Sequence, residues 1–300
     1  MNIKSGYVSI IGKPNAGKST LLNSFLKLKF SIATNKPQTT RKNIIGILSE
    51  EEYQIIFLDT PGILEPKYLL QKKMVEAVHS AVADSDVVLA LAECSAKGVH
   101  KDILKENLVN EVLQHTSKKK ILVLTKVDLI SQEKVTEEIE SLQQLKMFDE
   151  IIAVSAQEKF QVDVLIKLIL HYLPENPKYY PDDVLSSRNE RFFVSEFIRE
   201  KIFLFYEDEI PYSTEVVIED FKEREGRKDF IQAEIYVEKE SQRKILIGKD
   251  GAGIKKLGAA ARKDIEAFLE REVYLDLRVR VKENWRKNEN MLRSLGYGDE

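Results

Sequence analysis

The 300-residue sequence has one cysteine, Cys94, so it cannot form an internal disulfide. Cys94 lies at the end of an apolar run, and we expect a small core residue in a protein of a reducing compartment. The four histidines (His79, His100, His115 and His171) are far apart, and none makes a metal-ligand pair. This scarcity argues against a zinc site and against a histidine-based hydrolase.

Long hydrophobic runs are also missing, since no apolar segment approaches the roughly 20 residues of a membrane-spanning helix. Residues 1–6 lead directly into a strand-like segment, so we expect no secretory signal. The hydrophobic content of 43% and charged content of 32% indicate a folded globular protein. The length suggests about two domains.

A strong excess of positive charge is absent, because the formal net charge is -3. Basic pairs nevertheless occur in the C-terminal part: Arg243-Lys244, Lys255-Lys256, Arg262-Lys263 and Arg286-Lys287. Acidic residues interleave with them, which is equally typical of a mixed solvated surface. Composition therefore leaves RNA binding open.

The first half of the chain alternates between strand-like and helix-like patterns. Apolar, β-branched runs lie at 7–11, 44–48, 55–58, 87–91, 121–124 and 151–154. Helical patterns lie at 18–28, 68–83, 133–146 and 160–172, the last with Val164, Leu165, Leu168 and Ile169 on one face. We predict an α/β domain whose six-stranded, mostly parallel sheet has helices on both faces. Runs 44–48 and 55–58 are too close for an intervening helix, so they should form a hairpin with one antiparallel edge strand.

The order of elements changes after a proline-rich stretch. Residues 173–183 contain three of the eight prolines, which exclude a helix or an inner strand there. Beyond it we predict a helix at 190–206 that buries Phe193, Phe197 and Ile198 or their neighbours. Strands at 214–221 and 230–237, helices at 241–247 and 252–269, and a strand at 273–281 should follow. We therefore divide the chain into a first domain (1–173), a linker (174–186), a small α+β domain (187–285) and a tail (286–300).

The segment after the first run is a phosphate-binding loop. Gly12-Lys13-Pro14-Asn15-Ala16-Gly17-Lys18-Ser19 matches G-x-x-x-x-G-K-[ST], between a strand and a helix that continues with Thr20. A random chain of this length would match with a probability of about 1%. Backbone N–H groups of such a loop surround phosphates, Lys18 reaches the β- and γ-phosphates, and the Ser19 hydroxyl binds Mg²⁺.

Two further segments complete a triphosphate site. Asp59-Thr60-Pro61-Gly62 ends the third run, where Asp59 can hold the Mg²⁺ shell and Gly62 can offer its N–H to the γ-phosphate. Gln38-Thr39-Thr40-Arg41 lies in a polar connection, and a threonine there can complete the Mg²⁺ coordination. We choose Thr40, with Thr39 as the alternative.

The base predicted for this site is guanine. In Thr125-Lys126-Val127-Asp128, the Asp128 carboxylate can accept from both N1–H and the exocyclic amine of guanine, an arrangement that adenine lacks. Lys126 supplies an aliphatic stem under the base. Ser155-Ala156 ends the next strand, where a backbone N–H can meet the guanine O6. The alternative of an ATP-dependent protein that remodels RNA conflicts with Asp128, because adenine would leave this carboxylate unpaired.

These motifs together resemble the Era family of ribosome-assembly GTPases, a branch of the P-loop Ras-like GTPases. Thr125 departs from the family, which usually has asparagine there to bond the base and brace the phosphate loop. We predict weaker nucleotide affinity with guanine selectivity retained, and tighter GDP binding in a Thr125→Asn variant.

Hydrolysis is predicted to be slow. Ile63 follows Gly62 where many GTPases place a water-orienting glutamine, and an aliphatic side chain cannot orient water. The resemblance implies that K⁺ held by Asn15 assists turnover and that a partner raises it. Together with the phosphate and Mg²⁺ contacts described above, this assigns four residues to catalysis: Asn15, Lys18, Thr40 and Gly62.

The second domain contains G-x-x-G in Ile247-Gly248-Lys249-Asp250-Gly251, a pattern expected about once by chance in such a chain. Its place between two helices, with basic neighbours, is typical of the loop by which KH domains clamp about four nucleotides of single-stranded RNA. The element order is that of a type II KH domain, and Ile254-Lys255-Lys256-Leu257-Gly258 with the preceding loop resembles the KH segment of the Era family. The alternative is an ordinary helix–helix turn with surface lysines.

The resemblance covers nearly the whole chain. It implies a cytoplasmic monomer that binds GTP/GDP, Mg²⁺ and K⁺, with weak peripheral association with the inner face of the cell membrane. It also implies that the GTP state controls binding to the 3′ end of small-subunit ribosomal RNA during 30S assembly. The alternative is a nucleotide-gated RNA-binding scaffold whose hydrolysis is incidental.

Overall fold

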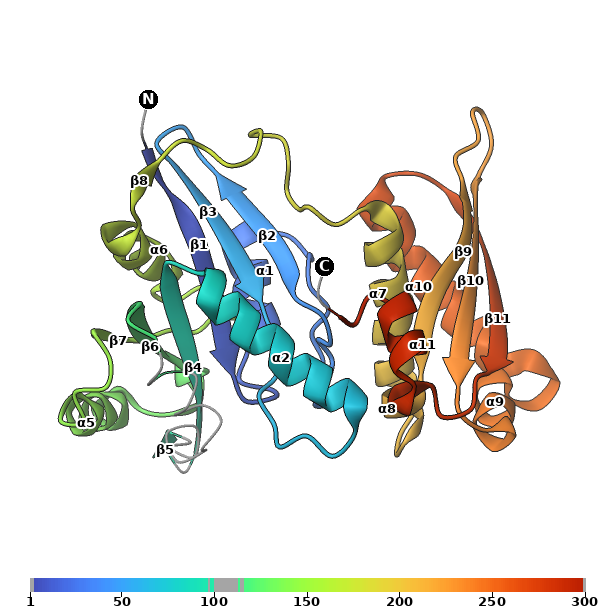
Figure 1. Ribbon diagram of the computed structural model, residues 1–300, viewed down its shortest axis with the longest axis horizontal. Helices are drawn as coiled ribbons and strands as arrows, with labels where there is room; N and C mark the ends of the chain where they lie inside the picture. The colour runs from blue at the N-terminus through green and yellow to red at the C-terminus, as the bar shows by residue number, and fades with distance from the viewer. Residues whose placement is uncertain (1–2, 97, 100–112, 114–115, 299–300) are drawn as a thin grey trace. The chain divides into compact units, whose positions relative to one another are not determined.

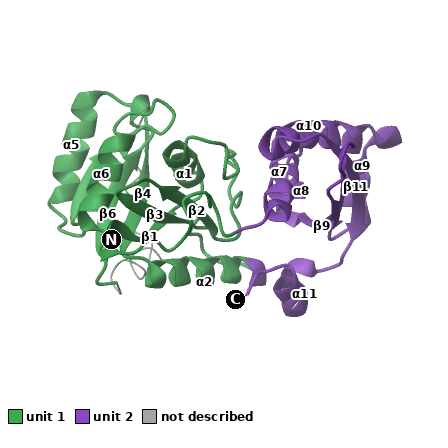
Figure 2. Ribbon diagram, turned by 90° about the horizontal axis from the view of Figure 1, so that it is seen from above, with its two compact units in different colours: residues 1–67, 71–187 green, residues 68–70, 188–300 purple. Residues whose placement is uncertain are grey.

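The computed structural model describes residues 3–96, 98–99, 113 and 116–298. The chain forms two compact units, shown in different colours in Figure 2. The first comprises residues 1–67 and 71–187, and the second comprises residues 68–70 and 188–300. The predictions for His100 and His115 lie outside the described residues. Within the described part, no helix is long and apolar enough to cross a membrane.

The first unit is built on a mixed sheet with the strand order β2-β3-β1-β4-β6-β7 (Figure 1). The strands are β1 (Ile3–Gly12), β2 (Ile44–Ser49), β3 (Tyr53–Asp59), β4 (Val87–Ser95), β6 (Lys119–Thr125) and β7 (Glu150–Ala153). β2 pairs antiparallel with β3 at the edge, and the other pairs along this path are parallel. The predicted fold and its hairpin are confirmed. Two additional two-residue strands, β5 (Gly98–Val99) and β8 (Glu175–Asn176), were not predicted.

Helices follow most of these strands: α1 (Lys18–Leu26), α2 (Leu69–Asp84), α5 (Gln132–Gln143) and α6 (Val162–Tyr172). The strands β1, β3, β4 and β6 are almost wholly buried, as expected for parallel strands covered on both faces. Cys94 is a buried core residue, as predicted, and burial raises the pKa of its thiol to about 11.

One residue of a predicted helix face was misplaced: Leu165 and Ile169 are buried as predicted, whereas Val164 is not. α6 begins at Val162, and its buried stripe consists of Val162, Leu165 and Ile169. Val164 is 51% exposed, because a residue two positions after Val162 points about 200° away around a helix.

The proline-rich segment, predicted as a linker, is bonded along the sheet of the first unit. β8 pairs with the start of β1. The buried side chain of Gln54 on β3 accepts from the N–H groups of Tyr179 and Tyr180 at 2.8 and 3.0 Å. Farther on, Ile47 N donates to Leu185 O at 2.9 Å. The segment therefore follows the β1–β3–β2 side of the sheet, held chiefly by its own backbone.

The second unit has a three-stranded sheet with the order β11-β10-β9. Its elements are α7 (Glu190–Phe205), α8 (Ile210–Ser213), β9 (Glu215–Lys222), β10 (Asp229–Val237), α9 (Glu240–Ile247), α10 (Ala252–Leu269), β11 (Val273–Val281) and α11 (Glu289–Ser294). β9 is antiparallel and β11 is parallel to β10. α7 packs against β9 and α10, and α10 packs against β11. The predicted α-β-β-α-α-β order is confirmed, and Phe193, Phe197 and Ile198 are buried as expected. The short helices α8 and α11 were not predicted.

The C-terminal residues pack within the second unit. Trp285 is fully buried, and its Nε1 donates to Ser213 O at 2.9 Å. Tyr297 is 5% exposed, and its hydroxyl donates to a carboxylate oxygen of Glu215 at 2.7 Å. The segment predicted as a tail from 286 onward thus contributes to the core of this unit.

Candidate functional site

The phosphate loop lies between the end of β1 and the start of α1. Two of its residues adopt left-handed backbone conformations, Asn15 with φ 67° and Gly17 with φ 90°. Asn15 Nδ2 donates to Asn35 O at 2.8 Å, which ties the loop to the connection that carries Thr40. The α1 N-terminus follows directly, so its unpaired N–H groups and the positive end of its dipole face the loop.

Lys18 is held inside the loop by the loop's own carbonyl groups. Its Nζ donates to Gly12 O at 3.1 Å and to Lys13 O at 2.8 Å. The residue is buried, and this burial lowers the pKa of its ammonium group from 10.5 to about 8. A bound polyphosphate would place negative charge beside the ammonium group. We therefore expect it to raise the pKa of Lys18 again.

This pKa predicts proton uptake on nucleotide binding. Below pH 8 the free protein holds a charged Lys18, and binding requires no proton. Above pH 8 the free protein holds a neutral amine that must gain a proton to pair with phosphate. We expect uptake near zero at about pH 6.5, rising toward about one proton per GDP near pH 9, with affinity falling accordingly. Calorimetric titration in two buffers of different ionisation enthalpy measures this uptake, and equal apparent enthalpies in both buffers at pH 9 would contradict the prediction.

Three oxygen-bearing side chains converge beside Lys18. Ser19 Oγ donates to Asp59 Oδ2 at 2.8 Å and lies 2.9 Å from Thr40 Oγ1. Thr39 is not part of this cluster, since its hydroxyl donates to Lys36 O at 2.7 Å. All three clustered residues are buried, and Asp59 is 0% exposed. Thr40, and not Thr39, therefore lies beside Ser19, and the binding of Mg²⁺ by Thr40 stays a prediction.

The Asp59-Thr60-Pro61-Gly62 segment follows β3 directly. Thr60 Oγ1 donates to Ile10 O at 2.7 Å, which ties the segment to β1. A Cβ at Gly62 would lie 2.8 Å from Pro14 Cα, so only glycine permits this approach to the phosphate loop. Ile63 is 2% exposed and belongs to the hydrophobic core of this unit. Its side chain is thus turned into the core and cannot orient a water molecule.

The predicted base-binding residues come from the ends of β6 and β7. Thr125 Oγ1 donates to Ala16 O at 2.8 Å, so the threonine retains a brace to the phosphate loop. Lys126 adopts a left-handed conformation with φ 58°, and its Nζ forms an ion pair with Glu93 at 2.6 Å. This contact holds the lysine stem at the side of the phosphate pocket that Lys126 lines. Asp128 presents an exposed carboxylate.

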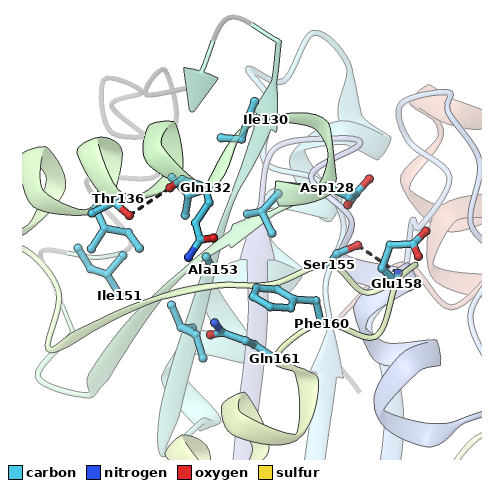
Figure 3. Close-up of a pocket in the computed structure, with 14 residues that line it drawn as sticks. Asp128, Ile130, Gln132, Thr136, Ile151, Ala153, Ser155, Glu158, Phe160 and Gln161 are labelled. Carbon is cyan, nitrogen blue, oxygen red and sulfur yellow. Dashed lines mark hydrogen bonds between the residues drawn. The ribbon is translucent and has the colours of Figure 1, made fainter.

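Figure 3 shows Asp128 and Ser155 on the same side of a cavity of about 550 Å³ between α5, β7 and the loop before α6. Ser155 Oγ accepts from Glu158 N at 3.1 Å, the contact drawn in the figure, and Ser155 is 2% exposed. This bond rigidifies the turn that carries the Ser155-Ala156 backbone. The structure therefore brings the predicted base-recognition segments to one corner of the sheet.

The geometry of Thr125 sharpens the prediction made for it. Because the hydroxyl already braces Ala16, a Thr125→Asn variant gains only a contact with the base, and we expect its GDP affinity to rise by about tenfold. Thr125→Val removes the brace while keeping the shape and should weaken GDP binding by about the same factor. Competition with a fluorescent GDP analogue measures both, and equal affinities for parent and Thr125→Asn would contradict this account.

The G-x-x-G loop of the second unit lies between α9 and α10. Gly248 and Gly251 have φ values of 70° and 77°, and Asp250 between them has φ 51°. A Cβ at Gly251 would meet nothing within 4 Å, so this side of the loop is open to an approaching phosphate backbone. Lys249, Asp250, Lys255 and Lys256 are exposed. Ile247 is half-buried at the end of α9.

A groove of about 300 Å³ begins beside this loop, between α10 and β11. Its lining combines mostly half-buried apolar residues with two exposed basic residues: Ile254, Lys255, Gly258, Ala259, Arg262, Leu275 and Leu277. A Cβ at Gly258 would lie 3.4 Å from Leu277, in van der Waals contact, so a longer side chain there would project into the groove. Ile254 and Lys255, both predicted, line this groove. Lys256 instead lies over the Phe205 ring at 4.8 Å.

Sequence reasoning missed several residues of both sites. In the first unit these are Asn23, Ser31 and Glu93, which no motif contains. Ser31 Oγ donates to Asp59 Oδ2 at 2.9 Å, and Glu93 pairs with Lys126 as described above. In the second unit, the groove residues outside the predicted RNA-binding set include Gly258 (part of the KH-like segment), Arg262 (part of a basic pair), Leu275 and Leu277. The sequence could have indicated Leu275 and Leu277, because residues two positions apart in a strand lie on the same face, here of β11.

Known proteins match this chain over both units. A family model described as 50S ribosome-binding GTPase matches residues 7–126, and one described as KH domain matches residues 209–286. GTPase Era of Clostridium botulinum is 44% identical over 294 residues, covering 98% of each chain. This chain belongs to the Era family of GTPases. The predicted recognition, a GTPase domain followed by a KH domain, is confirmed.

Other members of the Era family extend the comparison. GTPase ERA1 of maize chloroplasts is 47% identical over 301 residues, which cover 100% of this chain and 72% of the maize protein. Two Era structures each superpose with a TM-score of 0.91 at 36% identity, covering 99% of this chain and 100% of the other. One is an Aquifex aeolicus Era variant bound to GDP·AlF4⁻. The other is Era in complex with MgGDPNP and nucleotides 1506–1542 of 16S ribosomal RNA.

Proposed function

We propose that this GTPase is a nucleotide-controlled switch that binds the single-stranded 3′ end of small-subunit ribosomal RNA and assists 30S assembly. The observation that carries the proposal is that one chain combines a hydrogen-bonded Ser19–Thr40–Asp59 cluster with a groove of apolar and basic residues on the helix that follows a G-x-x-G loop. The first fits a nucleoside triphosphate, and the second fits unpaired nucleotides. The Era structure bound to 16S ribosomal RNA supports the choice of RNA.

The donor set fits Mg²⁺. Hydroxyl and carboxylate oxygens are the ligands that this ion prefers, and the ion usually keeps several waters. We propose that Ser19 and Thr40 bind it directly and that Asp59 holds its water shell. When bound, the ion would neutralise charge on the β- and γ-phosphates. Lys18 and the N–H of Gly62 would stabilise the same charge from the protein side.

The switch is tested by measuring RNA affinity in each nucleotide state. Fluorescence anisotropy with a labelled oligonucleotide of the 16S 3′ end should show at least about tenfold tighter binding with a non-hydrolysable GTP analogue than with GDP. A Lys18→Met variant, which loses the phosphate contact, should show no difference between the two nucleotides. Equal affinities for the parent protein in both states would leave two independent binding units and remove the switch.

A scaffold with incidental hydrolysis is the second candidate, favoured by the burial of Ile63 in the core. Both candidates predict slow intrinsic turnover, because no side chain at this position orients water. Single-turnover hydrolysis with and without RNA separates them. Stimulation by RNA supports the switch, whereas an unchanged rate supports the scaffold.

We also propose that K⁺ at Asn15 assists hydrolysis. Asn15 is exposed on the phosphate loop, with its amide tied to the connection that carries Thr40. Charge stabilisation at this position would act on the phosphates from the side of that connection. Hydrolysis should therefore be faster in K⁺ than in Na⁺, and the difference should vanish in Asn15→Ala. Identical rates in the two salts would exclude this role.

A monomeric state in the cytoplasm, with weak peripheral contact with the inner face of the cell membrane, completes the proposal and rests on the family resemblance. Light scattering of the purified protein and flotation with anionic vesicles test these two points.

A further inference from the structure

We propose that Ser31 is a positioning residue for the Mg²⁺ site, which holds the Asp59 carboxylate and is itself held by Asn23. The inference rests on the proposed binding of Mg²⁺ at Ser19, Thr40 and Asp59. It adds two residues that belong to none of the nucleotide-binding motifs of this sequence.

The carboxylate of Asp59 is oriented from two sides. Its Oδ2 accepts from Ser19 Oγ at 2.8 Å and from Ser31 Oγ at 2.9 Å. Ser19 lies on α1 within the phosphate loop motif, whereas Ser31 lies in the connection after α1. Asp59 is 0% and Ser31 is 1% exposed, so water does not compete for these bonds. Two fixed donors on one oxygen restrict rotation of the carboxylate more than one donor can.

Ser31 is in turn fixed by the side chain of Asn23, in the second turn of α1. Asn23 Oδ1 accepts from the backbone N–H groups of Phe30 and Ser31 at 3.0 and 2.6 Å. Asn23 Nδ2 donates to Ser31 O at 2.7 Å. One amide thus binds the backbone of Ser31 on both sides and leaves its hydroxyl directed at Asp59. The path from helix to carboxylate contains only buried or half-buried groups.

The position of Ser31 along the chain adds a second effect. The segment that ends at Thr40 begins at Ser31, so the Asn23–Ser31 contacts anchor one end of the segment that presents the other hydroxyl of the cluster. Ser31 therefore contributes to the orientation of Asp59 directly and to the placement of Thr40 through the backbone. Both effects reduce the conformational entropy that the site would lose on binding Mg²⁺.

A purely structural role for Ser31 is the competing explanation, because a buried carboxylate needs donors whether or not a metal binds. The two explanations differ in one measurable quantity. A structural role changes the melting temperature alone, whereas a positioning role also changes the Mg²⁺ concentration needed to retain nucleotide. The test therefore measures metal dependence and not hydrolysis.

The experiment follows release of fluorescent GDP while free Mg²⁺ is varied with a chelator. For Ser31→Ala we expect the half-maximal Mg²⁺ concentration for GDP retention to rise about tenfold, the effect of losing one hydrogen bond to a charged group. Release in excess chelator should remain unchanged. Ser9→Ala is the matched control, since it deletes another buried serine hydroxyl, which lies 3.0 Å from Ser85 Oγ. Its Mg²⁺ dependence should equal that of the parent.

Two further variants keep the test decisive. Ser31→Cys preserves the size with a weak donor and should reproduce the shift if Ser31→Ala folds poorly. In an Asp59→Asn background, Ser31→Ala should add less than about twofold, because the residue acts through Asp59. A half-maximal concentration within twofold of the parent for both Ser31 variants would overturn the positioning role. If GDP retention by the parent protein did not depend on the Mg²⁺ concentration, the proposed metal site would be refuted. The role of Ser31 would then be refuted as well.

Discussion

Replacing Asp128 with asparagine is expected to weaken GDP binding by about three orders of magnitude or more and to transfer the preference to xanthosine diphosphate. The predicted role of the carboxylate is to accept two hydrogen bonds from guanine, whereas an asparagine would present one acceptor and one donor. The mismatched donor would face the guanine amine, and a site built for such bonds rejects ligands that lack them by several kcal/mol. Xanthine carries a carbonyl where guanine carries that amine, so the new donor is satisfied there.

Competition of the guanosine, xanthosine and adenosine diphosphates for a fluorescent probe measures this exchange. Asp163→Asn is the control, since it makes the same replacement in the exposed first turn of α6 and should leave the order of affinities unchanged. If Asp128→Asn kept its preference for GDP, the base would be read elsewhere in the site.

Replacing Gly258 with leucine is expected to lower RNA affinity by about a hundredfold while leaving GDP binding unchanged. A Cβ at this position already approaches Leu277 to 3.4 Å, so a leucine side chain fills the groove between α10 and β11. The loss corresponds to about two stacked or bonded nucleotides at about 1–3 kcal/mol each. Leucine also favours the helix over glycine by about 1 kcal/mol, so α10 itself should not be weakened.

Anisotropy with the 16S oligonucleotide gives the affinity, and thermal melting shows that the domain remains folded. Ala267→Leu adds the same apolar side chain on the same helix at an exposed position outside the groove, and it should bind RNA as the parent does. Unchanged RNA affinity in Gly258→Leu would move the RNA site away from this groove.

Local patterns in the sequence were sufficient for most of the secondary structure and for the nucleotide motifs. The phosphate loop from Gly12 to Ser19 could be recognised because its function depends on consecutive backbone groups. The strand runs were recognisable because buried parallel strands must be apolar on both faces. The short helices α8 and α11 were missed, since neither four nor six residues carry a measurable helical period.

Contacts between distant segments were beyond the reach of these patterns. Thr39 and Thr40 are equivalent as residue types, and only the fold shows that Thr40 meets Ser19 while Thr39 bonds to Lys36. Thr125 departs from the family pattern, yet the fold shows that its hydroxyl still braces the phosphate loop through Ala16.

The sequence by itself therefore determined the order of the longer elements and the class of nucleotide site, and it gave the prediction that Asp128 selects the base, because each depends on neighbouring residues. The tertiary structure alone decided which hydroxyl completes the Ser19–Asp59 cluster, that Ser31 and Asn23 support it, and that the proline-rich segment is bonded along the sheet. These features join residues that are not neighbours in the chain, for example eight residues apart for Asn23 and Ser31 and 40 apart for Ser19 and Asp59, through a few hydrogen bonds each. Neither the type nor the spacing of these residues indicates such a bond, because the donor and the acceptor come together only when the chain folds.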